Sequence, residues 1–263
     1  MIKELNHIGI RVGDIDKSVE FYTEVLGGKI VRDAKATSGD GRFVYIQISE
    51  GLIELIKGKP GASNLGLAHI AFLIDDKQNL DEAYEYLSKK GFEFTATPKL
   101  ASSGDGRLSF FNETSGVSFE LIERKENIRI PGLVNEHILE FDHLSIRVSD
   151  ESYDRTNDFL LNEMGFKVRK ILTKGATVMS YYSHGVDTVE TLYTPGREKA
   201  EKPLGHMAFR VKDCFGTKKY LESMGVACGE PKESALGGFN ILNINGPDGE
   251  VMEFVDRPAL DKM

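Results

Sequence analysis

Four stretches of the sequence repeat one short pattern, and this repeat restricts the fold more than any other feature. Each stretch begins with a histidine, and the four read HIGIRV, HIAFLI, HLSIRV and HMAFRV. Apolar residues alternate with other residues in each stretch, which is typical of a β-strand with one buried face. Four copies along one chain indicate that the same supersecondary unit is repeated four times.

Each copy continues in the same order. The strand is followed by a turn that contains Asp or Ser, by a stretch with helical character, and by a glycine that can end a helix. A second strand is expected next, at KIV, FEF, FKV and VAC in the four copies, and then a β-hairpin. In the first copy the hairpin strands are FVYIQIS and LIELIKG. The predicted unit is therefore β-α-β-β-β.

The four units are expected to pair into two modules. The predicted modules are residues 1–124 and 138–263, and a charged linker at 125–137, interrupted by Pro131-Gly132, separates them. Alternating strands suit a sheet that has helices on one face and a cavity on the other. The predicted fold class is α+β, with two βαβββ units in each module.

Composition excludes several classes of function. The net charge is −8 and charges of both signs are mixed along the chain, which disfavours nucleic acid as a partner. No apolar run reaches the roughly 18 residues of a membrane span, and the segment MIKELNHIGI lacks the apolar core of a signal peptide. Cys214 and Cys228 form neither a CxxC pair nor a disulfide framework. We therefore expect a cytoplasmic protein without a membrane partner.

Eight acidic and imidazole side chains occur in register along the four units. A glutamate follows three of the four histidines by 47 residues and the other by 51, each time between apolar strand residues. A buried carboxylate is costly without a cation or hydrogen-bond donors. Two imidazoles and two carboxylates form a mixed N/O set that suits nickel, cobalt, zinc, manganese or iron. The predicted ligands are His7, Glu54, His69, Glu120, His143, Glu190, His206 and Glu253.

At these residues the chain resembles the vicinal oxygen chelate superfamily. This group includes glyoxalase I, methylmalonyl-CoA epimerase, fosfomycin-resistance proteins, extradiol dioxygenases and bleomycin-binding proteins. The resemblance covers nearly the whole chain, in HIGIRVGDIDKSVEFYTEVLG, LIELI, GLAHIAF, VSFELIE, PLGHMAF and GPDGEVMEF. It implies sheets that curl around a metal, with up to two divalent ions per chain. Each site could take its ligands from one module or from both, and the sequence leaves this open.

The resemblance to glyoxalase I implies a metal-dependent isomerase, epimerase or lyase. A proton next to a metal-bound carbonyl would be removed to give an enediolate, with Glu120 or Glu253 as the base. Arg11 and Arg147, four residues after their histidines, would hold a substrate carboxylate. Arg42 or Arg107, in the two SGDGR segments, could close over an anionic substrate, with Arg107 as the predicted contact. The expected partner is an anionic, oxygen-rich small molecule.

Two other functions fit the same family. An extradiol dioxygenase would use His143, His206 and Glu253 as a facial triad, and a resistance-type protein would bind a small molecule without catalysis. An asparagine common in glutathione-dependent relatives is replaced by Gly58 and Thr194, which argues against a glutathione-linked substrate. The chain is expected to be a monomer or a homodimer.

Overall fold

The computed structural model describes residues 1–104, 106–124 and 126–260, and it confirms the fourfold βαβββ order. The first half of the chain contains β1 (Ile2–Val12), α1 (Ile15–Glu20), the π-helical turn η1 (Phe21–Val25), β2 (Lys29–Lys35), β3 (Arg42–Ile48), β4 (Gly51–Lys57), β5 (Gly66–Ile74), α2 (Leu80–Lys89), β6 (Glu93–Leu100), β7 (Arg107–Asn112) and β8 (Ser118–Glu123).

The second half repeats this series with small differences. Its elements are β9 (Glu140–Val148), α3 (Tyr153–Asp158), the π-helical turn η2 (Phe159–Glu163), β10 (Lys167–Lys174), β11 (Thr177–His184), β12 (Asp187–Tyr193), β13 (Leu204–Arg210), α4 (Cys214–Ser223), β14 (Lys232–Glu233), β15 (Asn240–Asn245) and β16 (Val251–Val255). No helix among the described residues is both long and apolar enough to cross a membrane.

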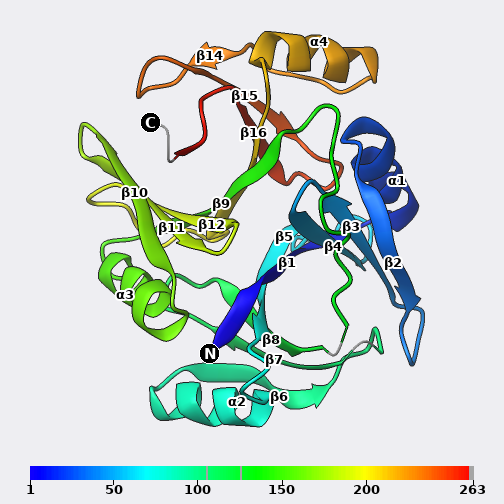
Figure 1. Ribbon diagram of the computed structural model, residues 1–263, viewed down its shortest axis with the longest axis vertical. Coiled ribbons are helices and arrows are strands. Elements are labelled where there is room, and N and C mark those ends of the chain that lie inside the picture. The colour runs from blue at the N-terminus through cyan, green and yellow to red at the C-terminus, as the bar shows by residue number, and fades with distance from the viewer. Residues whose placement is uncertain (105, 125, 261–263) are drawn as a thin grey trace.

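Each half forms one eight-stranded sheet. The strand order is β2-β3-β4-β1-β5-β8-β7-β6 in the first sheet and β10-β11-β12-β9-β13-β16-β15-β14 in the second. The first strands of the two units, β1 and β5 or β9 and β13, pair antiparallel at the centre, and each pairs in parallel with the last strand of its own unit. Both sheets curl, and the helices lie on their outer sides (Figure 1).

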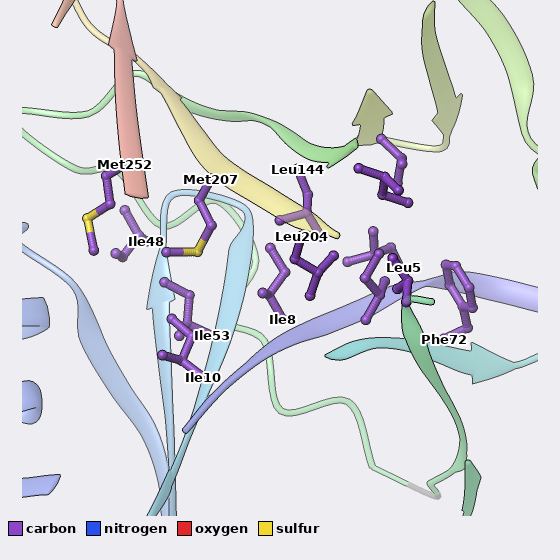
Figure 2. Packing of buried hydrophobic residues seen from close by; sticks show 14 of the residues in the cluster. Leu5, Ile8, Ile10, Ile48, Ile53, Phe72, Leu144, Leu204, Met207 and Met252 are labelled. Carbon is purple, nitrogen blue, oxygen red and sulfur yellow. The ribbon is translucent and has the colours of Figure 1, made fainter. Parts of the chain in front are cut away.

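The two halves share one core. Ile8, Ile10 and Val12 alternate along β1 toward the buried side, as the sequence pattern predicts. Figure 2 shows Ile10 and Ile53 of the first sheet beside Met207 of the second, and all of them belong to one cluster of buried apolar residues. Aromatic side chains also cross between the halves, because the ring of Phe159 in η2 contacts Phe119 in β8. We refer to the two halves as the first and second modules.

Two local features differ from the sequence predictions. The strand expected at Val226–Cys228 is absent from the described structure, and its place at the sheet edge is taken by the two-residue β14. Pro231 directly before β14 has no amide N–H and cannot extend the ladder upstream. In addition, α1 and α3 are each followed directly by a π-helical turn within the stretch for which the sequence predicts helical character.

Candidate metal centres

The eight predicted ligands stand on the four central strands of each sheet. In the first module His7 lies on β1, Glu54 on β4, His69 on β5 and Glu120 on β8, and these strands are direct neighbours. Gly9 pairs with both Glu54 and His69 across its two strand partners. The structure therefore assembles each group within one module, which is one of the two arrangements that the sequence left open. We call the group in the first module centre 1.

Centre 1 is compact and almost completely buried. The Nε2 atoms of His7 and His69 lie 3.1 Å apart. Nε2 of His7 lies 3.2 Å from Oε2 of Glu54 and 3.3 Å from Oε2 of Glu120. Nε2 of His69 lies 3.0 Å from the same oxygen of Glu120 and 3.6 Å from that of Glu54. Four donor atoms therefore converge on one point.

These separations fit a divalent metal ion. Bonds of about 2.1 Å from nitrogen and oxygen to one ion place neighbouring donors roughly 3 to 3.5 Å apart. The measured separations in centre 1 span 3.0 to 3.6 Å. Two imidazole nitrogens with two carboxylate oxygens are also a donor set that first-row divalent ions accept. The residues present in centre 1 therefore fit the group that the sequence predicts.

The two glutamates of centre 1 are held differently. Tyr45 stands opposite Glu54 on β3, and its hydroxyl donates a hydrogen bond of 2.6 Å to Oε1 of Glu54. Phe110 occupies the corresponding place opposite Glu120 on β7, and a phenyl ring has no hydroxyl to donate. Tyrosine therefore fixes the orientation of Glu54, whereas Glu120 has no equivalent side-chain donor at that position.

Centre 1 also contains residues that the sequence analysis missed. Nδ1 of His7 lies 2.9 Å from Oδ1 of Asn6, and Nη1 of Arg124 donates to the same oxygen at 3.1 Å. An oxygen that accepts from Arg124 also accepts from His7, so Nδ1 of His7 carries a proton and Nε2 is the nitrogen that can give its lone pair to a metal ion. The sequence signals were a polar residue before the first histidine and an arginine four residues after the last glutamate.

The charges in centre 1 are strongly coupled. Burial opposes protonation of His7, but Glu54 and Glu120 outweigh it and raise the pKa of His7 to about 9. Burial likewise favours the neutral acid at Glu120, yet His69 and His7 hold the pKa of this carboxyl below its usual range. Without a metal ion the centre therefore retains a proton, which binding of a divalent cation would release.

The group in the second module, centre 2, is more open. Nε2 atoms of His143 and His206 lie 3.0 Å apart, and Oε2 of Glu190 lies 3.7 Å and 3.8 Å from them. Glu253 approaches only His206, at 3.9 Å, and lies outside the compact group formed by the other three. Burial raises the pKa of Glu253 to about 7 and lowers that of His206 to about 4.

Centre 2 nevertheless has features of a cation site. Oε2 of Glu190 is buried without a hydrogen-bond partner among the described residues, and it faces the two histidines. Tyr181 stands opposite Glu190 as Tyr45 stands opposite Glu54. Asp142 accepts from Nδ1 of His143 at 2.7 Å and from Arg257. The donor chemistry therefore fits a divalent ion here too.

A cavity of about 350 Å³ adjoins centre 1. It is lined by Glu54, His69 and Glu120 and by the basic side chains of Arg11 and Lys99. Nε of Arg11 is buried without a hydrogen-bond partner among the described residues. This cavity can receive a small molecule in direct contact with the donors and with an uncommitted guanidinium group.

The other two predicted arginines, Arg147 and Arg107, do not line the cavity beside centre 1. Arg147 occupies the position on β9 that Arg11 occupies on β1, one residue before the strand ends. Arg107 forms two hydrogen bonds to the carboxylate of Asp81, at 2.7 and 2.8 Å, and Arg42 of the first SGDGR segment is held by Asp33 and Asp16. The substrate role of Arg107 therefore remains a prediction, and it would require this ion pair to open.

Comparison with known proteins gives a consistent result. The family model described as Glyoxalase/Bleomycin resistance protein/Dioxygenase superfamily matches residues 4–121 and again 140–254. Lactoylglutathione lyase of Escherichia coli O157:H7 is 31% identical over 129 residues, which cover 46% of this chain and 93% of that protein. Lactoylglutathione lyase GLX1 of Arabidopsis thaliana is 30% identical over 125 residues, so 45% of this chain matches only 43% of that protein.

Solved structures resemble the fold over almost its full length. The 2,3-dioxygenase LapB from Pseudomonas sp. KL28 superposes with a TM-score of 0.68 at 16% identity and covers 97% of this chain and 92% of its own. Identity at this level supports the fold alone. With two family matches that together span most of its length, the chain belongs to the glyoxalase, bleomycin resistance protein and dioxygenase superfamily.

Proposed function

We propose that the chain is a divalent-metal-dependent isomerase or lyase of the glyoxalase I type, with centre 1 as its active site. One observation carries the proposal: of two carboxylates that meet the same pair of histidines, Glu54 is fixed by Tyr45, and Glu120 faces Phe110. A glutamate that both binds the metal and acts as the catalytic base must be able to move away from the metal. Of the two glutamates, Glu54 is held in place by the Tyr45 hydroxyl, and Glu120 has no tyrosine opposite it.

His7, Glu54, His69 and Glu120 would hold the ion. When bound, a divalent metal acts as a Lewis acid that stabilises negative charge on substrate oxygen atoms. The two carboxylates balance its charge, so Arg11 and Lys99 remain as net positive charges in the cavity. This balance favours an anionic, oxygen-rich substrate, with a substrate carboxylate beside Arg11.

Glu120 would then act as the proton shuttle. Its carboxylate accepts a proton from the carbon beside a substrate carbonyl, and the electron pair of the broken C–H bond moves toward the carbonyl oxygen. The same proton returns from Glu120 to the neighbouring carbon, and the hydroxyl proton of the first carbon passes to the former carbonyl oxygen, so no atom is gained or lost.

The test uses the full chain loaded with nickel, cobalt, zinc or manganese. Candidate substrates are α-hydroxyketones and the hemithioacetal of methylglyoxal with glutathione, assayed in D2O for deuterium at the carbon beside the carbonyl. Glu120→Gln keeps a ligand oxygen but cannot accept the proton. We expect its turnover to fall by at least about 100-fold while its metal content is kept, in line with the usual contribution of a general base.

Two further variants separate a base from a ligand. Phe110→Tyr places a hydroxyl opposite Glu120, as Tyr45 stands opposite Glu54, and should lower turnover without lowering metal content. Glu253→Gln makes the matching change in centre 2 and tests whether that centre contributes. Full activity in Glu120→Gln, in Glu253→Gln and in the double variant would exclude this mechanism.

Two outcomes would favour the other family functions. Oxygen consumption with catechols that depends strictly on iron(II) would indicate a dioxygenase. Against that function, Glu190, which is not part of the triad, groups with His143 and His206 and would fill a position that oxygen or substrate needs. A chain that takes up no divalent ion, yet binds a small molecule in the cavity beside Arg11, would be a binding protein.

A further inference from the structure

In each module, Nδ1 of the first ligand histidine forms a hydrogen bond with the side chain of the residue directly before it. In the first module this residue is Asn6, and in the second it is Asp142. Both side chains are buried, and both present Oδ1 to Nδ1 of the following histidine, at 2.9 and 2.7 Å. Because Nδ1 donates, Nε2 of each histidine is available to a cation.

An arginine completes the same unit in both modules. Arg124 donates to Oδ1 of Asn6, and Arg257 donates to Oδ1 of Asp142. Each arginine also lies over the tyrosine that faces the first glutamate, at 5.1 Å from the ring centre of Tyr45 and 6.0 Å from that of Tyr181. The two modules therefore build one relay from arginine to Asn or Asp to histidine.

The relays differ in one chemical group, an amide in the first module and a carboxylate in the second. A carboxylate that accepts from Nδ1 makes the imidazole a stronger electron donor at Nε2 than a neutral amide does. The arginine does not cancel this difference, because it is present in both relays. The side chains are almost the same size, so the geometry of the relay is preserved while its charge changes.

We propose that Asn6 and Asp142 are positioning residues that set the metal affinity of their own centres, and that the carboxylate gives the tighter binding. This inference rests on the proposed function, since it assumes that each of the two centres binds a divalent ion. It concerns the effect of each residue within its own centre, so the different geometries of centres 1 and 2 do not enter the comparison.

The experiment measures Co²⁺ affinity by competition with a chelator in the metal-free full chain. Centre 2 is isolated in a His69→Ala background and centre 1 in a His206→Ala background. We expect Asp142→Asn to weaken centre 2 by 10- to 100-fold, which is typical for loss of a carboxylate behind a histidine ligand. Asn6→Asp should strengthen centre 1 by at least about tenfold for the same reason.

Two controls keep the test specific. Glu4 lies 3.2 Å from the amide nitrogen of Asn6, so Asn6→Asp is also made together with Glu4→Gln to remove the new repulsion. The visible spectrum of bound Co²⁺ should keep its shape in Asp142→Asn, because the ligand geometry is retained. A merely structural role would instead lower the melting temperature of the metal-free chain and leave the affinity unchanged.

The outcomes distinguish the two proposals. Affinities within twofold of the parent in both Asp142→Asn and Asn6→Asp, with Co²⁺ bound normally, would overturn this inference and leave the proposed function intact. Failure of both parent backgrounds to bind Co²⁺ would overturn the proposed function and this inference together.

Discussion

Centres 1 and 2 have the same four residue types but differ in how closely these meet. Glu120 lies 3.0 Å from its histidine in centre 1, and Glu253 lies 3.9 Å from the corresponding histidine in centre 2. The side chain of His69 is 5% exposed and that of His206 is 16% exposed. In addition, the chain after β16 turns back into the concave side of the second sheet, with Arg257 and Leu260 buried (Figure 1).

One position between the ligands differs between the two centres. Gly9 on β1 pairs with His69, and a Cβ added to Gly9 would lie 2.0 Å from Cε1 of that imidazole. Ser145 takes the same place on β9 opposite His206, so centre 2 has a side chain where centre 1 has none, although the Nε2 atoms of its two histidines remain 3.0 Å apart. The comparison teaches that the ligand set alone does not define a centre, because the same four residue types meet at different distances and have different neighbours.

The largest effect is expected from Gly9→Ser, which transfers this feature of centre 2 to centre 1. The new side chain must displace His69, so one ligand moves away. We expect metal affinity at centre 1 to fall by more than the roughly 10- to 100-fold that is typical of losing an outer partner. Chelator competition in the His206→Ala background measures it. Ser145→Gly is the reciprocal change and should not weaken centre 2; unchanged affinity in Gly9→Ser would refute the steric explanation.

A smaller and equal effect in the two modules is expected from Tyr45→Phe and Tyr181→Phe. The Tyr45 hydroxyl donates to Oε1 of Glu54, and its loss leaves a buried carboxylate oxygen without that donor. We expect about tenfold weaker metal binding at the affected centre. Affinity is again measured one centre at a time. A strong effect of Tyr45→Phe beside a negligible effect of Tyr181→Phe would show that the two tyrosines have different roles.

The smallest effect concerns a buried acid that only the second module has. Asp187 begins β12 where Gly51 begins β4, and burial raises the pKa of Asp187 to about 7 although Arg129 lowers it. Between about pH 4 and 7 the folded chain binds a proton that the unfolded chain has lost. Stability should therefore fall as the pH rises through this window and level off above it.

The free energy of unfolding should decline less between pH 5 and pH 8 in Asp187→Asn than in the parent. The difference should exceed about 1 kcal/mol, since one pKa unit corresponds to about 1.4 kcal/mol. The comparison requires urea unfolding of the metal-free parent and variant at pH 5 and pH 8. At pH 5 the two should be nearly equally stable, because the carboxyl is then protonated. An identical loss of stability between these pH values in both proteins would contradict the assignment.

Much of the fold and of the donor groups follows from local sequence pattern. Alternation along β1 predicts which side chains face the core, and the regular spacing of His and Glu predicts which residues share a face. Spacing could not decide whether His7 joins Glu120 or Glu253, because both pairings satisfy the same repeat. That choice depends on which first strands pair at the sheet centre, and it is a long-range property of the β1–β5 ladder.

Other features depend on partners that are distant in the sequence. Arg107 was predicted to face substrate, but Asp81 at the start of α2 engages its guanidinium group, and no local pattern links these two residues. The relay from Arg124 through Asn6 to His7 joins residues 118 positions apart. The relay recurs in the second module as Arg257, Asp142 and His143, and a comparison of the two modules can detect this repeat.

The donors of centre 1 lie on both sides of the β1–β5 ladder, which is the junction between the first and second βαβββ units. His7 and Glu54 belong to one unit, and His69 and Glu120 belong to the other. An ion in this position would therefore act as a crosslink between the two βαβββ units of the first module. In the sheet these units are otherwise joined by the backbone hydrogen bonds of the β1–β5 ladder. Metal binding would then make this junction open less often. The exchange rates of the most slowly exchanging amide protons of β1 would fall accordingly.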